Sequence, residues 1–248
     1  MKIDDLKQYL VQILQPDNFD DYCPNGLQVE GRAEVKKIIT GVTASQALID
    51  AAIAENADAI LVHHGYFWKG EGQTITGIKK RRIHALLAND ISLFAYHLPL
   101  DAHPEFGNNV MLGKVLGLPI TRWVDQKHML AVSELERAVR LDAISNLIES
   151  KLSRAPQVIG AEDRLVKTIA WCTGAAQGYI ERVVSENVDV FISGEISEQT
   201  VHIAREANIA YIAAGHHATE RYGINALGEH LAQKFAFEHQ FIDIENPV

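Results

Sequence analysis

Short apolar runs that alternate with helical segments restrict the fold of this chain more than any other feature of its sequence. The runs are rich in Ile, Val and Leu and have the length of buried strands; they lie at residues 38–42, 59–62 and 91–96. Helical periodicity predicts helices over residues 2–14, from near Gln46 to about Asn56, and over 77–89. Thr43 and Gln46 form a capping-box pattern at the start of the second helix. Strands that alternate with helices predict a helix-covered, mixed or mainly parallel sheet.

The second half of the chain repeats this pattern. Residues 39–64 align without a gap on residues 170–195, at a constant offset of 131, and a later apolar run at 209–214 matches 91–96. We therefore predict an α/β fold of two similar domains, residues 1–124 and 125–248. The second domain includes a short extra segment, 125–165, in which we expect a strand near 128–132 and a helix marked by Leu141 and Leu152.

Composition narrows the class of protein. The hydrophobic fraction of 47% is enough for a buried core, and no apolar run reaches the roughly 20 residues of a membrane span. A formal net charge of −9 argues against a nucleic-acid-binding surface. The two cysteines, Cys23 and Cys172, are too distant in sequence to indicate a disulfide framework, and Cys172 is expected to be a buried thiol. No leader pattern precedes the first helix, so we expect the protein in the cytoplasm.

Histidines gather where the predicted strands end. His63 and His64 follow the run at 59–62, and His97 follows the run at 91–96. In α/β sheets, ligands bind beyond the carboxyl ends of the strands. Imidazole is a ligand for zinc, iron, nickel and copper. The alternative for the adjacent pair is one buried, hydrogen-bonded histidine and one exposed histidine.

Two of these strand ends are followed by a histidine and a carboxylate four residues apart. Pro99 indicates that Asp101 lies in a loop, as a metal ligand, a general base or a turn residue. If a helix begins near His216, then His216 and Glu220 share one face of it, and His217 points elsewhere. The alternative is a surface His–Glu pair. Because all the groups end apolar strands on the ligand-binding side of the sheets, we predict a metal site.

The number of candidate ligands indicates how many ions this site holds. There are six of them: His63, His64, His97, Asp101, His216 and Glu220. Six exceeds the four ligands of a structural zinc site, and none is cysteine, so a catalytic or dinuclear centre is favoured. Two ions about 4 Å apart could share a bridging carboxylate, for which Asp101 and Glu220 are the candidates. The ions could be Zn, Fe, Mn or Ni, because imidazole and carboxylate ligands accept all four.

At these residues the chain resembles the dinuclear-metal family known as GTP cyclohydrolase 1 type 2 homologues, and within it the YbgI-like proteins. The resemblance runs nearly end to end, through Asn25–Gln28, His63–Gly65, Trp68–Glu71, Ser193–Thr200 and Gly215–Glu220. It implies two similar α/β domains, a toroidal homohexamer and a two-metal site. The implied ligands are His63, His64, Asp101, His216 and Glu220, with His97 beside them. Because the repeat divides these ligands between the two halves of the chain, we expect the site at their junction.

Two functions fit this sequence. The first is a metal-dependent hydrolase acting on a nucleotide-like substrate, in which Glu220 or Asp101 orients a water molecule. Glu195, which corresponds to His64 in the repeat, is a candidate general acid or base, or forms a structural hydrogen bond. Tyr66, Phe67 and Trp68 are candidates to stack on a base, or belong to a subunit interface. The second function is a ring-forming, metal-binding interaction or regulatory protein without turnover.

Overall fold

The computed structural model describes residues 1–248, which divide into two compact units. Unit 1 comprises Met1–Phe106 and Gly223–Ile244, and unit 2 comprises Gly107–Tyr222 and Glu245–Val248. This division differs from the boundary expected between residues 124 and 125. Helix α5 (Asn108–Leu116) belongs to unit 2, because its Leu112 and Leu116 pack in the same core as Trp171. The later turns of helix α9 (His216–Phe235) supply Ile224 and Leu227 to the core of unit 1.

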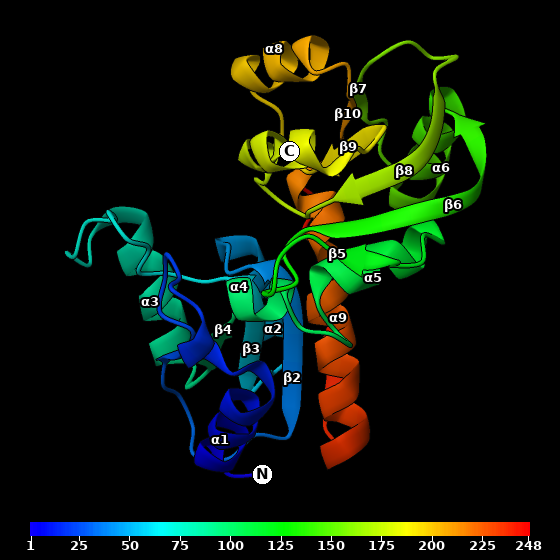
Figure 1. The fold of residues 1–248 in the computed structure, drawn as a ribbon. Coiled ribbons are helices and arrows are strands. Elements are labelled where there is room, and N and C mark those ends of the chain that lie inside the picture. Colours follow the sequence, from blue (N-terminus) through cyan, green and yellow to red (C-terminus); the bar gives the residue numbers. More distant parts are fainter. The chain divides into compact units, whose positions relative to one another are not determined.

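Unit 1 is built on a five-stranded mixed sheet in the order β1-β4-β3-β2-β11. Its strands are β1 (Gly26–Val29), β2 (Lys37–Thr43), β3 (Ala59–His64), β4 (Ser92–Ala95) and β11 (Glu238–Phe241). Only β1 runs antiparallel to its neighbour, and β2, β3 and β4 lie side by side as parallel strands (Figure 1). The helices in the first segment of unit 1 are α1 (Ile3–Leu14), α2 (Gln46–Ala54), α3 (Gly77–Ala88) and α4 (Leu98–Asp101), with a 3-10 turn, η1, at Pro16–Asn18.

The sheet of unit 1 is covered on both faces, because alternate strand residues point to opposite sides. On one face, Leu61 and Phe94 pack with the apolar stripe of α1 and with the later turns of α9. On the other face, Ile60 and Leu93 pack with α2 and α3. The helix predicted over residues 2–14 is therefore confirmed, and its apolar residues Ile3, Leu6, Leu10 and Leu14 are buried.

Unit 2 is built on a six-stranded mixed sheet in the order β5-β6-β8-β9-β10-β7. Its strands are β5 (Arg122–Trp123), β6 (Ala131–Arg140), β7 (Gln157–Ile159), β8 (Leu165–Trp171), β9 (Val190–Ser193) and β10 (Ala210–Ala213). Helices α5 and α6 (Leu141–Leu152) pack on one face. The other face holds α7 (Ile180–Val183), flanked by the 3-10 turns η2 (Gln177–Tyr179) and η3 (Val184–Glu186), and α8 (Glu198–Glu206). The segment 125–165 supplies β6, next to the edge strand β5, as well as the opposite edge strand β7 and helix α6.

The repeat predicted from the sequence has a structural counterpart at the same offset. Ile38 pairs with Ala59 between β2 and β3, and Ile169 pairs with Val190 between β8 and β9. Asp58 accepts hydrogen bonds from the backbone N–H groups of residues 36 and 37, and Asp189 accepts them from residues 167 and 168. The two units therefore share the register of their central strands and the carboxylate that stabilises it. Two α/β units with helix-covered mixed sheets confirm the predicted fold class.

One local prediction is wrong. The N-cap of α2 is Ser45, whose side chain accepts a hydrogen bond from the N–H of Leu48. Thr43 is instead the last residue of β2, because the strand continues to pair with β3 as far as His64. The hydroxyl group of Thr43 is thereby placed beside the ring of His64.

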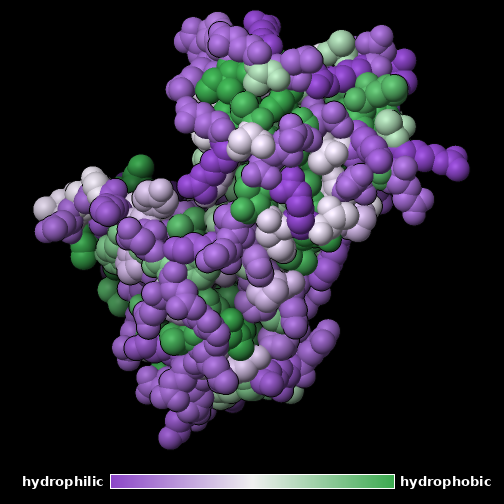
Figure 2. All heavy atoms as spheres, in the orientation of Figure 1, coloured by the Kyte–Doolittle hydropathy of each residue, from purple (hydrophilic) through white to green (hydrophobic).

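Apolar side chains are gathered in these cores, two in each unit. The face of the molecule seen in Figure 2 is accordingly mostly hydrophilic, with hydrophobic side chains visible only in patches. No helix combines the length and the apolar character that crossing a bilayer requires. Cys172 is buried, as predicted, and so is Cys23.

Candidate metal centre

Three histidines of unit 1 lie together at one edge of its sheet. His63 and His64 are the last residues of β3, and His97 immediately precedes α4 after the end of β4. Their ring centroids are separated by 4.5 Å (His63–His64), 5.1 Å (His63–His97) and 5.7 Å (His64–His97). One ring nitrogen from each lies within 4.8 Å of the other two. The three imidazoles are therefore close enough to share an ion.

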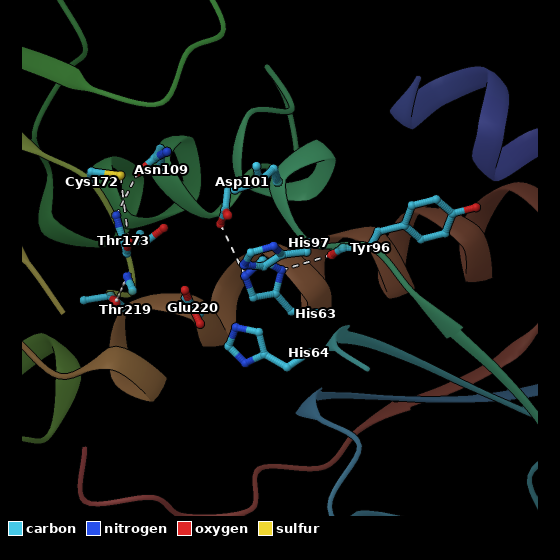
Figure 3. Close-up of polar contacts among 12 residues, drawn as sticks. His63, His64, Tyr96, His97, Asp101, Asn109, Cys172, Thr173, Thr219 and Glu220 are labelled. Atoms are coloured by element: carbon cyan, nitrogen blue, oxygen red, sulfur yellow. Dashed lines mark hydrogen bonds and ion pairs between the residues drawn. The ribbon is translucent and has the colours of Figure 1, made fainter. Parts of the chain in front are cut away.

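Asp101 lies in the short helix α4, not in the expected loop. Pro99 occupies the first turn of this helix, where a missing N–H costs no hydrogen bond, so it permits the helix that the sequence seemed to exclude. The side chain of Asp101 is buried, and its Oδ1 lies 3.5 Å from Nε2 of His63. Figure 3 shows this carboxylate directed at the His63 ring.

The opposite ring nitrogens of His63 and His64 are held by neighbouring strands. Nδ1 of His63 donates to the backbone oxygen of Tyr96 at 3.0 Å, since a carbonyl can only accept (Figure 3). Nδ1 of His64 lies 3.1 Å from the hydroxyl oxygen of Thr43. His63 is fully buried and His64 is half-buried, so neither is the exposed member of the alternative interpretation. The contacts direct Nε2 of His63 toward Asp101.

His97 is held by a residue that the sequence analysis missed. Its Nδ1 donates a hydrogen bond of 2.7 Å to Oδ1 of Asp21. Burial alone would raise the pKa of Asp21, but hydrogen bonds from His97 and Asn25 outweigh it and hold the pKa below its ordinary value. Asp21 is therefore a carboxylate anion beside the imidazole.

Unit 2 carries a second histidine–carboxylate pair at the start of α9. His216 is the first residue of this helix, and Glu220 is one turn later, with its Oε2 3.2 Å from Nε2 of His216. The predicted i, i+4 arrangement on one helix face is confirmed. His217 is buried, and its N–H donates to the backbone oxygen of Val248. A Cβ at Gly174 would collide with Oε1 of Glu220, so this position favours glycine.

Glu195 contacts His216 directly. Its Oε1 accepts a hydrogen bond of 2.7 Å from Nδ1 of His216, and its Oε2 accepts one from Gln177. The backbone oxygen of Glu195 is held by Tyr211 at 2.6 Å and by Ser193 at 2.8 Å. Glu195 therefore lies on the Nδ1 side of the His216 ring, where it can orient the ring, whereas Glu220 lies on the Nε2 side.

The pKa of His216 reflects this environment. Burial alone would lower the pKa, but hydrogen bonds and charge from Glu220 and Glu195 raise it to about 9. A site with this much negative potential favours a cation, whether a proton or a metal ion.

A backbone network fixes the loop that packs against Glu220. The N–H of Gly174 donates to the hydroxyl oxygen of Thr219, and the N–H of Thr173 donates to Oδ1 of Asn109 (Figure 3). Both bonds are buried and 3.0 Å long. They hold residues 173 and 174 beside the start of α9 in unit 2.

The spacing of these pairs fits metal ligation. Charge-assisted N–H···O hydrogen bonds are usually about 2.8 Å long. Two ligands of a tetrahedral Zn²⁺ ion, each about 2.1 Å from it, stand about 3.4 Å apart. The His63–Asp101 and His216–Glu220 pairs, at 3.5 and 3.2 Å, match the second value. With imidazole and carboxylate donors and anchored Nδ1 atoms, the residues present fit divalent metal ions.

The aromatic residues after His64 have different environments. Tyr66 is buried, and its hydroxyl donates to the backbone oxygen of Ala44, so it belongs to the core. Phe67 lies under the ammonium group of Lys79. Trp68 lies edge-on to His97, with ring centroids 5.0 Å apart, and Tyr22 lies on the same histidine at 6.4 Å. Trp68 and Tyr22, which the sequence analysis did not pair, are therefore the aromatic residues next to the histidines.

Comparison with known proteins finds a matching family model and several similar proteins. The family model Duf34/NIF3 (NGG1p interacting factor 3) matches residues 1–247. A Pseudomonas aeruginosa protein named GTP cyclohydrolase 1 type 2 homolog is 53% identical over 230 residues, 92% of this chain and 91% of its own length. A Salmonella typhimurium protein of the same name is 49% identical over the full length of both chains.

Solved structures give the same result. The structure described as "protein ybgI, unknown function" has a TM-score of 0.95 and 48% identity, and it covers 100% of both chains. A Thermus thermophilus protein has a TM-score of 0.89 and 33% identity, again over 100% of both chains. The chain, with its two mixed α/β units and its groups of residues able to hold metal ions, belongs to the Duf34/NIF3 family.

Proposed function

We propose that this protein is a dinuclear metal-dependent hydrolase that acts on a nucleotide-like substrate. One observation carries the proposal: each unit holds a histidine whose Nε2 stands at ligand spacing from a buried carboxylate while a second residue holds its Nδ1. Ring opening of the GTP-cyclohydrolase type is the reaction that the names of the relatives suggest.

The proposed ligands come from both units. They are His63, His64, His97 and Asp101 of unit 1 and His216 and Glu220 of unit 2. We propose that they serve one pair of divalent ions, as the resemblance implies, with Zn, Fe, Mn or Ni as the candidates. When bound, two such ions supply a water molecule of lowered pKa and positive charge that stabilises the transition state.

The protein's own residues have separate tasks in this proposal. Asp101 and Glu220 would offset the positive charge of the ions and orient the attacking water by hydrogen bonding. Glu195 keeps the proton of His216 on Nδ1, because its Oε1 already accepts that N–H. We therefore assign Glu195 to holding His216, and not to proton transfer with the substrate.

A nucleotide-like substrate is supported by the aromatic side chains beside His97. Trp68 is partly exposed, and Tyr22 is exposed over 62% of its surface. Nucleobases stack on such rings, with an energy of about 1–3 kcal/mol per base. A base held there would place the remainder of the substrate near the histidines of unit 1.

A panel of nucleotides tests the proposal. The protein is loaded with Mn²⁺, Fe²⁺ or Zn²⁺ and assayed for ring opening and phosphate release. We expect at least one nucleotide to be turned over, and Glu220→Ala to lower kcat by about 100-fold or more. Glu229→Ala, an exposed carboxylate on the same helix, is the matched control and should keep full activity.

The absence of turnover with every metal and every nucleotide would contradict the hydrolase. If the assembly of subunits into a ring then depended on metal, a structural or regulatory role for the ions would replace the proposed catalytic role. Asp101→Asn provides a second active-site variant, and circular dichroism shows whether each variant is folded.

A further inference from the structure

Asp21 makes an unusually complete set of hydrogen bonds for a residue between elements. Its Oδ1 accepts from the N–H of Tyr22 at 2.6 Å and from Nδ1 of His97 at 2.7 Å. Its Oδ2 accepts from Asn25 and from the N–H of Leu98, both at 2.9 Å. The side chain is only 3% exposed. A buried carboxylate with four donors has a fixed orientation, and so has any ring bonded to it.

The backbone of His97 is held from the same segment. Oδ1 of Asn25 accepts the N–H of His97 at 2.8 Å, while Nδ2 of Asn25 donates to Asp21. His97 is therefore anchored at its main chain and at its ring by two side chains that bond to each other. These partners precede it by more than 70 residues.

The chemical consequence concerns the tautomer of His97. An ionised carboxylate can only accept, so the proton of the neutral imidazole must lie on Nδ1 and the lone pair on Nε2. Metal-binding histidines commonly bond a carboxylate in this way, and removal of that partner typically costs 10- to 100-fold in metal affinity. Unit 2 contains the same contact, at the same 2.7 Å, between Glu195 and His216.

We propose that Asp21, assisted by Asn25, is a positioning residue that holds His97 as an Nδ1–H imidazole and makes its Nε2 a third nitrogen donor beside His63 and His64. The role rests on the metal centre of the proposed function, but not on turnover. A purely structural role for Asp21, as a clip between the 21–25 segment and α4, would lower stability without acting through His97.

Zinc binding by single and double variants distinguishes these roles. Affinity for Zn²⁺ is measured against a competing chelator for Asp21→Asn, His97→Ala and the double variant. We expect Asp21→Asn to weaken the binding by about 10- to 100-fold in the wild-type background and by less than about twofold in the His97→Ala background. The matched control is Asp20→Asn, which removes the same charge from the exposed neighbour and should leave affinity within about twofold.

The tautomer of the His97 ring provides a readout that a purely structural role of Asp21 would not change. In the metal-free protein, ¹⁵N NMR should show a single Nδ1–H tautomer of His97, and in Asp21→Asn a mixture of tautomers. Circular dichroism confirms that the variants are folded. Should Asp21→Asn fail to fold, Asn25→Ala is expected to weaken zinc binding only when His97 is present.

The proposal is overturned if Asp21→Asn keeps wild-type zinc affinity, or if its effect is as large without His97 as with it. Wild-type protein that binds no zinc overturns it as well, together with the metal centre. Wild-type protein that binds zinc but hydrolyses no nucleotide contradicts only the hydrolase, because affinity and tautomer still measure the role of Asp21.

Discussion

Each candidate metal-binding histidine has a hydrogen-bond partner at its Nδ1 atom, opposite the nitrogen that would bind a metal ion. These partners are the backbone oxygen of Tyr96, the hydroxyl of Thr43, and the carboxylates of Asp21 and Glu195. Such partners fix the ring orientation and raise the basicity of the other nitrogen. These anchors, together with the closeness of the histidines to one another and to carboxylates, support the proposed metal centre.

The raised pKa of His216 predicts how the stability of the metal-free protein depends on pH. The folded-state pKa of about 9 lies above the ordinary 6.5. The cost of burying the protonated ring lowers the pKa, but the hydrogen bonds and charges of Glu220 and Glu195 outweigh this cost. The resulting stabilisation is fully present below about pH 6.5 and is lost as pH rises through about 9. Between these values, the free energy of unfolding in urea should fall by on the order of 2 kcal/mol more than in His216→Gln.

An exposed histidine on α8 serves as the control. His202→Gln should leave the wild-type pH dependence unchanged. Identical pH dependence in wild type and His216→Gln would contradict the assigned contacts of this ring.

At the scale of elements, two residues near the start of α2 have different roles: one stabilises the helix and the other contacts a candidate metal ligand. Ser45→Ala removes the N-cap and should lower the free energy of unfolding by about 1 kcal/mol, without changing zinc affinity. Thr43→Val keeps the shape of the side chain but removes the hydroxyl beside Nδ1 of His64. It should weaken zinc binding and leave the helix intact.

Urea unfolding and zinc titration of both variants check this assignment. If Thr43→Val were the more destabilising change, and Ser45→Ala the one that weakens zinc binding, the two residues would have been assigned the wrong way round.

Elements with a local hydrophobic signal could be predicted from the sequence. The run at 59–62 and its counterpart in the repeat, 190–193, lie in strands β3 and β9, since continuous burial on both faces requires continuous apolar sequence. The helix at Asp101 was missed because proline excludes a helix interior but not a first turn. Asp21 gave no local signal, because its partner lies 76 residues away in the sequence and tertiary contacts, such as the pairing of β1 with β4, bring them together.

At the scale of the whole molecule, the repeated fold carries different side chains at equivalent strand ends. His64 of unit 1 corresponds to Glu195 of unit 2, at the offset of 131 that also aligns the strand registers. The same strand end therefore supplies an imidazole in one unit and the carboxylate that orients an imidazole in the other. The scaffold is shared, but the side chains at its strand ends are specialised.

The toroidal homohexamer implied by the resemblance stays a prediction, supported by exposed apolar side chains on and beside α3. Ile75 and Ile78, at the start of α3, are each more than half exposed and are close enough in sequence to form one apolar surface for a neighbouring subunit. Light scattering should give a mass six times the 27.5 kDa of one chain. Ile78→Glu should shift the mass downward if this surface is buried in the ring, and a wild-type monomer at micromolar concentration would contradict the prediction.

The most direct test of the central claim is a count of metal ions in purified protein by elemental analysis. We expect two divalent ions per wild-type chain, and two in the His202→Ala control. We expect fewer than two both in His63→Ala, from unit 1, and in His216→Ala, from unit 2. A wild-type count below two after metal loading, or an unchanged count of two in either variant, would contradict a pair of ions held by ligands from both units.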